Sequence, residues 1–206
     1  MSSGLRLGVL ASGAGTNLQA ILDRLHGSDG VEVVAVAGDE PGAPALERAA
    51  AAGIDSAVFE LGAYDGRAAR DTAMADWLLE RDVRLVVLAG YMKLLSRRFL
   101  NRFPNAVINV HPALLPSFPG LNAIEQALAH GVKVFGVTVH FVDEGVDSGP
   151  IILQRSIELP HARDAAEVHD LLRPLEHELL PDAIRLFARG ALSIDPDNPR
   201  RVLIAS

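Results

Sequence analysis

Short apolar runs alternate with amphipathic stretches along the first half of the chain. The runs are apolar at consecutive positions and rich in β-branched residues, which is typical of strands buried on both faces. They are LRLGVL at 5–10, VEVVAVA at 31–37, SAVF at 56–59, LVVLAG at 85–90 and AVINV at 106–110. The stretches at 17–26, 43–53 and 66–82 are predicted to be helices. This alternation predicts an α/β fold with an open, twisted, mainly parallel sheet and helices on both faces.

The pattern changes in the second half of the chain. Two long apolar runs, 132–142 and 150–159, are separated by a short glycine-rich loop, so they are predicted to pair as an antiparallel element. A helix is predicted from Asp164, as N-cap, to about Arg189, and Pro174 and Pro181 are expected to kink or divide it. The tail at 191–205 is predicted to form a last hairpin.

Composition narrows the class of protein. The chain has 206 residues, 49% of them hydrophobic, and residues 1–206 are predicted to form one domain. It has no cysteine, which excludes disulfides and thiolate nucleophiles and favours a cytoplasmic protein. The short apolar run at the start predicts neither a signal peptide nor a membrane span. A net charge of −7 argues against nucleic-acid or membrane partners, so small molecules are the expected partners.

The strongest chemical signal lies at the end of the fifth apolar run. Asn109 and His111 are two positions apart, so a strand presents both on one face, with His111 expected just past the strand's end. The segment DEGVDSGP carries Asp147 downstream. The Asn109 amide and the His111 imidazole can donate to an oxyanion, and Asp147 can accept a proton or support a protonated histidine. With no serine or cysteine in the Asn109 to Pro112 motif, these residues predict direct acyl transfer.

A glycine loop, ASGAGTN, follows the first apolar run and precedes a predicted helix. Gly13 and Gly15 allow backbone amides to approach a phosphate at the helix N-terminus, and Thr16 and Asn17 are further donors or ordinary caps. The dinucleotide fingerprint requires a third glycine where Leu18 stands, and the Gly-Lys pair of the P-loop is absent. The loop therefore predicts an anion site, with a simple strand-to-helix turn as the alternative.

Five segments in order resemble the phosphoribosylglycinamide formyltransferase family: SGAGTNLQAI, LAGYMKLLS, NVHPALLPSFPG, GVTVHFVDEGVDSGPIILQ and LEHELLP. The resemblance implies a Rossmann-like formyltransferase fold and transfer of a formyl group from 10-formyltetrahydrofolate to phosphoribosylglycinamide in purine biosynthesis, without a metal. It also implies that the N-terminal half binds the phosphoribosyl substrate and the C-terminal half binds the folate. A monomer or a homodimer is expected.

The resemblance also assigns roles to residues. Asn109, His111 and Asp147 match catalytic positions, Gly15, Thr16 and Asn17 match the phosphate loop, and Glu176 matches a contact to the glycinamide. Folate-side positions are matched by Arg67, by Met92, Lys93, Leu94 and Leu95, by Asn109, and by Asp143, Glu144, Gly145, Val146 and Asp147. The chain departs from the family pattern at Lys93, where many members have arginine, and at Ala106, Asn122 and Ile124.

Other interpretations are open for some of these residues. His111, His140 and Asp147 could form a metal triad, although Asn109 is a poor ligand for such a site. His140 lies within a predicted strand and is expected to be a buried or supporting histidine. Arg67 and Glu176 could face solvent on their helices, and Met92 and Leu95 could belong to the core.

Other functions share part of the pattern. A formyltetrahydrofolate hydrolase has a similar catalytic set, but it is expected to carry an N-terminal regulatory domain. Because the first apolar run begins at residue 5, no such domain is expected here. A methionyl-tRNA formyltransferase is expected to need a basic surface and a C-terminal RNA-binding domain. A non-catalytic phosphosugar-binding module would explain the glycine loop but not Asn109, His111 and Asp147.

Overall fold

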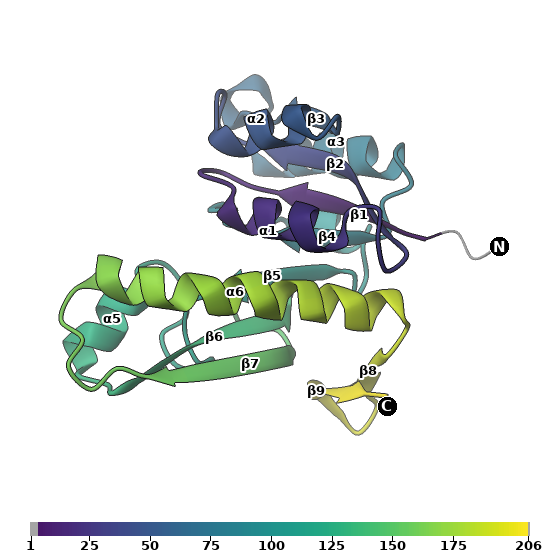
Figure 1. The fold of residues 1–206 in the computed structure, drawn as a ribbon. Coiled ribbons are helices and arrows are strands. Elements are labelled where there is room, and N and C mark those ends of the chain that lie inside the picture. The colour runs from purple at the N-terminus through teal and green to yellow at the C-terminus, as the bar shows by residue number, and fades with distance from the viewer. Residues whose placement is uncertain (1–3, 206) are drawn as a thin grey trace. The chain divides into compact units, whose positions relative to one another are not determined.

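The computed structural model describes residues 4–205, which divide into two compact units, one up to Asn109 and one from Val110 on (Figure 1). The first unit has the elements β1 (Leu5–Leu10), α1 (Thr16–Leu25), β2 (Val31–Gly38), α2 (Pro44–Ala51), β3 (Asp55–Val58), the 3-10 helix η1 (Leu61–Ala63), α3 (Arg67–Leu79), β4 (Leu85–Leu88), α4 (Arg97–Leu100) and most of β5 (Val107–His111). The assignment of residues 1–206 to one domain with a phosphoribosyl side and a folate side stays a prediction.

The strands of the first unit form a parallel sheet in the order β3-β2-β1-β4-β5. All five apolar runs of the first half are therefore strands, as the sequence predicts. The chain moves outward from β1 to β3 and then returns to β4, so the order reverses between β1 and β4. Open α/β sheets bind ligands beyond the carboxyl ends of the strands at such a reversal. The loops that follow β1 and β4 therefore lie where sheets of this kind bind their ligands.

The core of the first unit comes from the continuous apolar character of its central strands. Leu7 and Val9 of β1 are fully buried, and Leu18, Ile21 and Leu25 form one buried face of α1. The spacing of three and four residues places these α1 side chains on one side of the helix. Each such side chain stabilises the fold by about 1.5–3 kcal/mol relative to an exposed position.

The second unit has a mixed sheet. Its elements are α5 (Ala123–His130), β6 (Val134–Phe141), β7 (Ile151–Glu158), α6 (Ala165–Ala188), β8 (Leu192–Asp195) and β9 (Asn198–Ile204). β6 and β7 pair antiparallel, β7 pairs parallel with β9, and β8 and β9 form an antiparallel hairpin. The predicted antiparallel element and the predicted last hairpin are both confirmed. The fold class is thus the expected open sheet, mainly parallel, with antiparallel strands toward the C-terminus.

Helix α6 corrects one prediction. Asp164 caps it as expected, because its carboxylate accepts a hydrogen bond from the Ala166 amide at 3.0 Å, but the helix is not divided at Pro174 or Pro181. Each proline removes one backbone donor, whereas a long apolar face that includes Leu172 packs on β6 and β7 (Figure 1). Packing therefore outweighs the two lost hydrogen bonds. No helix within residues 4–205 is long and apolar enough to cross a membrane.

Candidate active site

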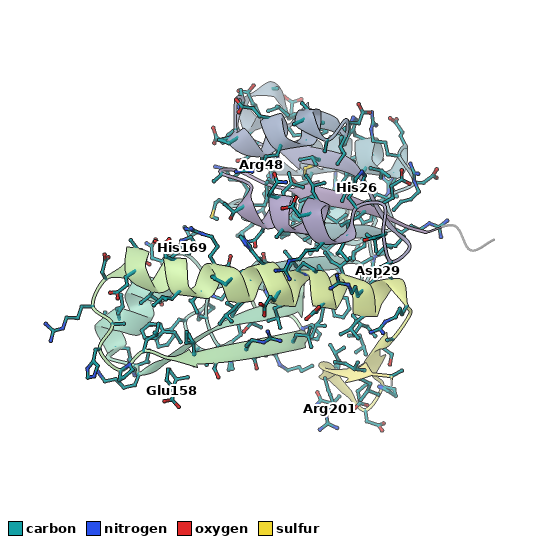
Figure 2. The ribbon with its side chains drawn as sticks, in the orientation of Figure 1. His26, Asp29, Arg48, Glu158, His169 and Arg201 are labelled. Atoms are coloured by element: carbon teal, nitrogen blue, oxygen red, sulfur yellow. The ribbon has the colours of Figure 1, made fainter. Side chains whose placement is uncertain are left out.

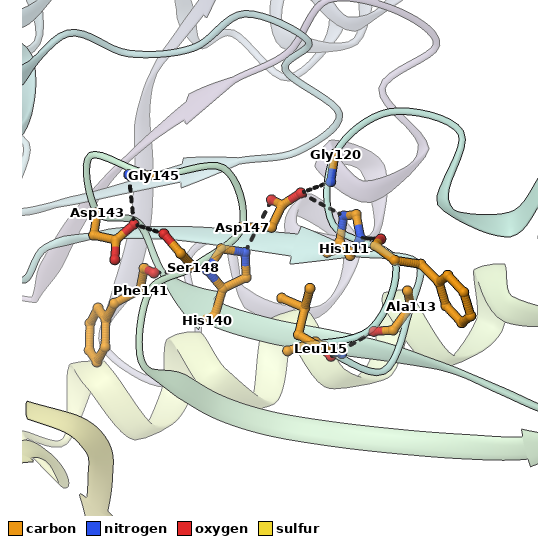
Figure 3. Close-up of polar contacts among 12 residues, drawn as sticks. His111, Ala113, Leu115, Gly120, His140, Phe141, Asp143, Gly145, Asp147 and Ser148 are labelled. Carbon is orange, nitrogen blue, oxygen red and sulfur yellow. Dashed lines mark hydrogen bonds and ion pairs between the residues drawn. The ribbon is translucent and has the colours of Figure 1, made fainter. Parts of the chain in front are cut away.

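Three side chains of the second unit meet around one carboxylate (Figure 3). His111 ends β5, His140 lies near the end of β6, and Asp147 lies in the loop between β6 and β7. One Asp147 oxygen, Oδ2, is 3.3 Å from His111 Nδ1, and the other, Oδ1, is 3.5 Å from His140 Nε2. The Gly120 amide donates to Asp147 Oδ2 at 2.7 Å. The structure thus brings His111 and Asp147 together, whereas their joint catalytic role stays a prediction. His111 is the last residue of β5 rather than the first beyond it.

The backbone contacts of the two histidines determine which ring nitrogens carry protons. His111 Nε2 is 2.9 Å from the Phe118 carbonyl, and His140 Nδ1 is 2.8 Å from the Phe141 carbonyl. A carbonyl oxygen can only accept, so each of these nitrogens carries a hydrogen. In the neutral rings the nitrogens that face Asp147 are then bare. Each histidine must take a second proton to donate to Asp147, so the carboxylate is arranged to support imidazolium charge.

The charge state of Asp147 follows from competing effects. Burial alone would raise the pKa of this carboxyl. The hydrogen bonds from His140 and from the Gly120 amide, together with the charges of His111 and His140, outweigh burial and lower the pKa to about 2. Asp147 is therefore an anion at neutral pH. A carboxylate of such low basicity is better suited to stabilise a neighbouring positive charge than to retain a proton.

The loop that contains Asp147 has a backbone that few residues can adopt. Asp147 has a φ of 48°, in the left-handed region. A Cβ at Gly145 would collide with the Ser148 hydroxyl, and a Cβ at Gly149 would collide with the Phe141 carbonyl. Asp143 holds the loop closed, because its Oδ1 accepts from the Gly145 amide at 3.0 Å and from the Ser148 hydroxyl at 2.6 Å. Neither glycine therefore has room for a side chain, and the loop folds tightly at both positions.

Thr138 of β6 holds the loop that orients His111. Its buried hydroxyl donates to the Ala113 carbonyl at 2.6 Å and accepts from the Leu115 amide at 3.1 Å. The same loop leads to Phe118, which has a left-handed φ of 56° and whose carbonyl lies 2.9 Å from His111 Nε2. The sequence did not point to Phe118, because a backbone carbonyl leaves no signal in the residue type. It did not point to Thr138 either, because threonine is common in strands.

Both ring nitrogens of His111 are engaged in this structure, which bears on its predicted role as an oxyanion donor. The contact to Asp147 is the longer one, at 3.3 Å, whereas the contact to the Phe118 carbonyl is 2.9 Å. Hydrogen bonds from nitrogen to oxygen weaken beyond about 3.2 Å. The side of His111 that faces Asp147 is therefore the side that a substrate oxygen or a bridging water can join. Asn109 is half-buried on β5, and strand alternation places it on the same face as His111.

The glycine loop of the first unit connects β1 to α1. Gly15 has a φ of 69°, and a Cβ there would lie 2.8 Å from Ala45, so only glycine fits. Gly13 has open space instead, so it does not require glycine for steric reasons. The Arg48 side chain, labelled in Figure 2, donates to the Ala14 carbonyl at 2.9 Å and fixes the loop. Thr16 and Asn17 open α1, where backbone amides at the helix N-terminus favour an anion.

The predicted folate-side residues of the first unit lie on exposed segments. Arg67 is the exposed first residue of α3. Met92 is 61% exposed and Leu94 is 54% exposed, so the alternative that Met92 belongs to the core is wrong. Leu95 is half-buried, and the Lys93 ammonium lies 3.4 Å from Asp39 Oδ2. Exposed apolar side chains in a loop at the strand-order reversal are typical of a binding surface.

The remaining predicted residues lie in the second unit. Glu176 is buried on α6, so the alternative that it faces solvent is wrong. Glu144 and Val146 are exposed in the β6–β7 loop. Within the part of the chain that the structure describes, no group of three or more histidine, aspartate or glutamate side chains is arranged to hold a metal ion. Of the positions that depart from the family pattern, Asn122 precedes α5 with a φ of 58° and Ile124 is buried.

Comparison with known proteins extends over both units. The formyl transferase family matches residues 5–184. The phosphoribosylglycinamide formyltransferase of Bacillus subtilis is 40% identical over 181 residues, which cover 87% of this chain and 93% of that protein. The Haemophilus influenzae protein of the same name is 38% identical over 190 residues, covering 92% of this chain and 90% of that protein. Glycinamide ribonucleotide transformylase 1 from Symbiobacterium toebii superposes with a TM-score of 0.95 at 47% identity, covering 100% of this chain and 96% of that one.

Proposed function

The chain belongs to the formyl transferase family, and from that premise we propose that it transfers a formyl group from 10-formyltetrahydrofolate to the amine of 5'-phosphoribosylglycinamide. It is a one-carbon group transferase of purine biosynthesis that acts on small molecules, like the relatives it matches. The observation that carries the assignment is the position of the Asp147 carboxyl group between two imidazoles, with Asn109 two positions before His111 on the same strand.

The chemistry requires one bond to form and one to break. The amine nitrogen attacks the formyl carbon, negative charge develops on the formyl oxygen, and the bond from that carbon to the folate nitrogen then breaks. We assign Asn109 and doubly protonated His111 as donors to the developing oxyanion. Asp147 remains ionised throughout and stabilises the second proton on His111. The proton lost by the amine passes through water to the departing folate nitrogen, so the enzyme ends in its starting state.

The other predicted residues are assigned to binding. Gly13, Gly15, Thr16 and Asn17 hold the phosphate with backbone amides and polar side chains at the start of α1. Glu176 accepts a hydrogen bond from the glycinamide substrate. The folate contacts Arg67, the 92–95 stretch and the 143–147 loop, where exposed backbone groups can pair with the edges of its ring. The anionic substrate is held by local donors, which is consistent with the net charge of −7.

A transferase must discriminate between its amine substrate and water, and this gives the test of the proposal. The site can stabilise the same tetrahedral species whichever nucleophile attacks, so selectivity has to come from alignment of the amine. Purified protein with 10-formyltetrahydrofolate alone is expected to release tetrahydrofolate slowly. Phosphoribosylglycinamide is expected to accelerate the release with stoichiometric formylated product, whereas free glycinamide, which lacks the phosphate, is not. Folate release is followed by absorbance and the product by chromatography.

The same assay separates the alternatives. Rapid folate release that is indifferent to the nucleotide would identify a formyltetrahydrofolate hydrolase. Binding of the nucleotide without folate release under any of these conditions would identify a non-catalytic phosphosugar-binding module. Equal acceleration by free glycinamide would contradict the role of the phosphate in alignment.

Thr16→Asp is expected to weaken phosphoribosylglycinamide binding about tenfold or more, because it places a carboxylate beside the phosphate site. The affinity for tetrahydrofolate is expected to stay within about twofold of wild type. Titration calorimetry with each ligand measures both affinities. Thr72→Asp is the charge-matched control, at a half-buried position of α3 where the Thr72 hydroxyl donates to the Ala68 carbonyl. Equal weakening of both ligands by Thr16→Asp would make the glycine loop a structural turn.

A further inference from the structure

Two loops of the first unit lie where the order of its strands reverses. The glycine loop, residues 11–17, follows β1, and the β4–α4 loop, residues 89–96, follows β4. Backbone hydrogen bonds already connect them, since the Ser12 amide donates to the Gly90 carbonyl at 3.1 Å. The first loop carries the proposed phosphate donors and the second carries Met92 to Leu95 on the proposed folate side.

Side chains join the same two loops in a closed ring of four residues, which we call the polar ring: Ser12, Asp39, Met92 and Lys93. The Ser12 hydroxyl donates to Asp39 Oδ1 at 2.6 Å and accepts from the Met92 amide at 3.0 Å. The ring closes because Lys93, the neighbour of Met92, places its ammonium 3.4 Å from Asp39 Oδ2. Asp39 directly follows β2, so three consecutive carboxyl-end segments of the sheet meet in the ring.

Burial gives the polar ring its strength. The Asp39 side chain is only 2% exposed, and among residues 4–205 its Oδ2 has no hydrogen-bond donor at close range besides the ion pair with Lys93. A short bond from a hydroxyl to a buried carboxylate is charge-assisted and about twice as strong as a neutral one. The Ser12 hydroxyl has a single hydrogen, which points to Asp39. Its oxygen therefore presents a lone pair to the Met92 amide. The position of each loop therefore depends on the other.

The far end of the β4–α4 loop is fixed separately. Asp71 of α3 accepts from the Ser96 amide at 2.6 Å, and its other oxygen accepts from Arg70 at 2.6 and 2.9 Å. Both side chains of this ion pair are almost completely buried. The loop is thus anchored rigidly at Ser96, whereas its Met92 end is held by the glycine loop. If the glycine loop is displaced, Met92 is therefore expected to move, whereas Ser96 is expected to stay in place.

We propose that Ser12 and Asp39 are positioning residues that couple the two binding events, so that the phosphate-bearing substrate and the folate each tighten the binding of the other. The proposal rests on the proposed function, because it uses the phosphate and folate roles of the two loops. A phosphate bound at the glycine loop orders Ser12, and the polar ring then orders Met92 and Lys93 before the folate arrives. By thermodynamic linkage, the folate must tighten the phosphate substrate by the same factor.

The coupling factor is measurable without catalysis. Tetrahydrofolate carries no formyl group, so its complex with phosphoribosylglycinamide cannot react. Calorimetry gives the Kd of tetrahydrofolate for the protein alone and for protein saturated with phosphoribosylglycinamide, and the ratio of these values is the coupling factor. Wild type is expected to show a factor of about five or more. Ser12→Ala and Asp39→Asn are expected to reduce the factor to below about two, while each single-ligand Kd stays within about threefold of wild type.

Control variants separate coupling from general destabilisation. Ser12→Thr keeps the hydroxyl and is expected to retain the coupling. Two further variants change the same residue types away from the polar ring: Ser28→Ala, just after the end of α1, and Asp23→Asn, on the exposed face of α1. Both are expected to leave the coupling factor unchanged. The proposal would be overturned if wild type showed no coupling, or if Ser12→Ala and Asp39→Asn kept the wild-type coupling factor. In either case, binding of both ligands to wild type would leave the proposed function intact. Failure of wild type to bind either ligand would overturn the proposed function as well.

Discussion

Asn109→Ala is expected to lower kcat by about a hundredfold or more, while KM for both substrates stays within about threefold of wild type. The reason is the developing charge on the formyl oxygen. The Asn109 carboxamide is a neutral donor that needs no proton transfer, so it can stabilise the oxyanion at any pH at which the protein is folded. A donor used mainly in the transition state contributes to kcat and little to binding. Steady-state kinetics with both substrates varied measures the two constants.

A matched asparagine provides the control for this variant. Asn101 lies at the exposed end of α4, and Asn101→Ala is expected to keep wild-type kcat. Near-wild-type kcat for Asn109→Ala would remove Asn109 from the oxyanion site. A matched rise in both KM values with unchanged kcat would instead make it a residue that holds the bound substrates.

Asp147→Asn is expected to reduce kcat by about a hundredfold or more. The change keeps the shape of the side chain and the acceptor for the Gly120 amide, but it removes the negative charge that supports a second proton on His111. Steady-state kinetics of wild type and Asp147→Asn, with both substrates varied, measures the loss in kcat. A fully active variant would contradict the electrostatic role of Asp147.

The same variant also reports the linkage between Asp147 and stability. The pKa of Asp147 in the folded protein is lowered to about 2, so its contribution is present above the unfolded value of about 4 and is lost as the pH falls toward 2. The difference in unfolding free energy between wild type and Asp147→Asn is expected to be about 2 kcal/mol above that window and to disappear below it. Urea unfolding at each pH measures the difference. The exposed Asp170→Asn variant is expected to show no such trend.

The fold was accessible from local patterns. Consecutive apolar residues predict β1, β2, β4 and β5 because a strand covered on both faces needs apolar side chains at most positions. The expectation of burial on both faces is wrong for β3, which lies at the edge of the sheet and is largely exposed. The change to two long runs separated by glycines predicts the antiparallel pairing of β6 and β7. The prediction that Pro174 and Pro181 kink or divide α6 considered only the hydrogen bond lost at each proline. It could not include the packing of the helix on β6 and β7, which involves residues far away in the sequence.

The candidate site was accessible only in part. The two-residue spacing of Asn109 and His111 places both on one strand face, which follows from the pleat of a strand alone. Residue chemistry offered Asp147 as a partner for His111, and the resemblance gave both residues catalytic positions, but no spacing along the chain predicts that the two side chains meet. Asp39 had a weak signal, an acidic residue directly after a buried strand, but its link to Ser12 and Met92 could not be read from the sequence.

The sequence by itself determined the order of strands and helices along the chain, the glycine loop between β1 and α1, and the identity of the groups that can donate or accept protons. All of these depend on residue type and on periodicity between near neighbours. Tertiary structure alone decided the protonation pattern around Asp147, which depends on the carbonyls of Phe118 and Phe141 and on the Gly120 amide, 27 residues away. It also decided the contact between Ser12 and Met92, which are 80 residues apart. Such contacts arise where segments that are distant in the sequence pack together. The backbone groups that take part are present in every residue type, so the sequence does not reveal which of them make a contact.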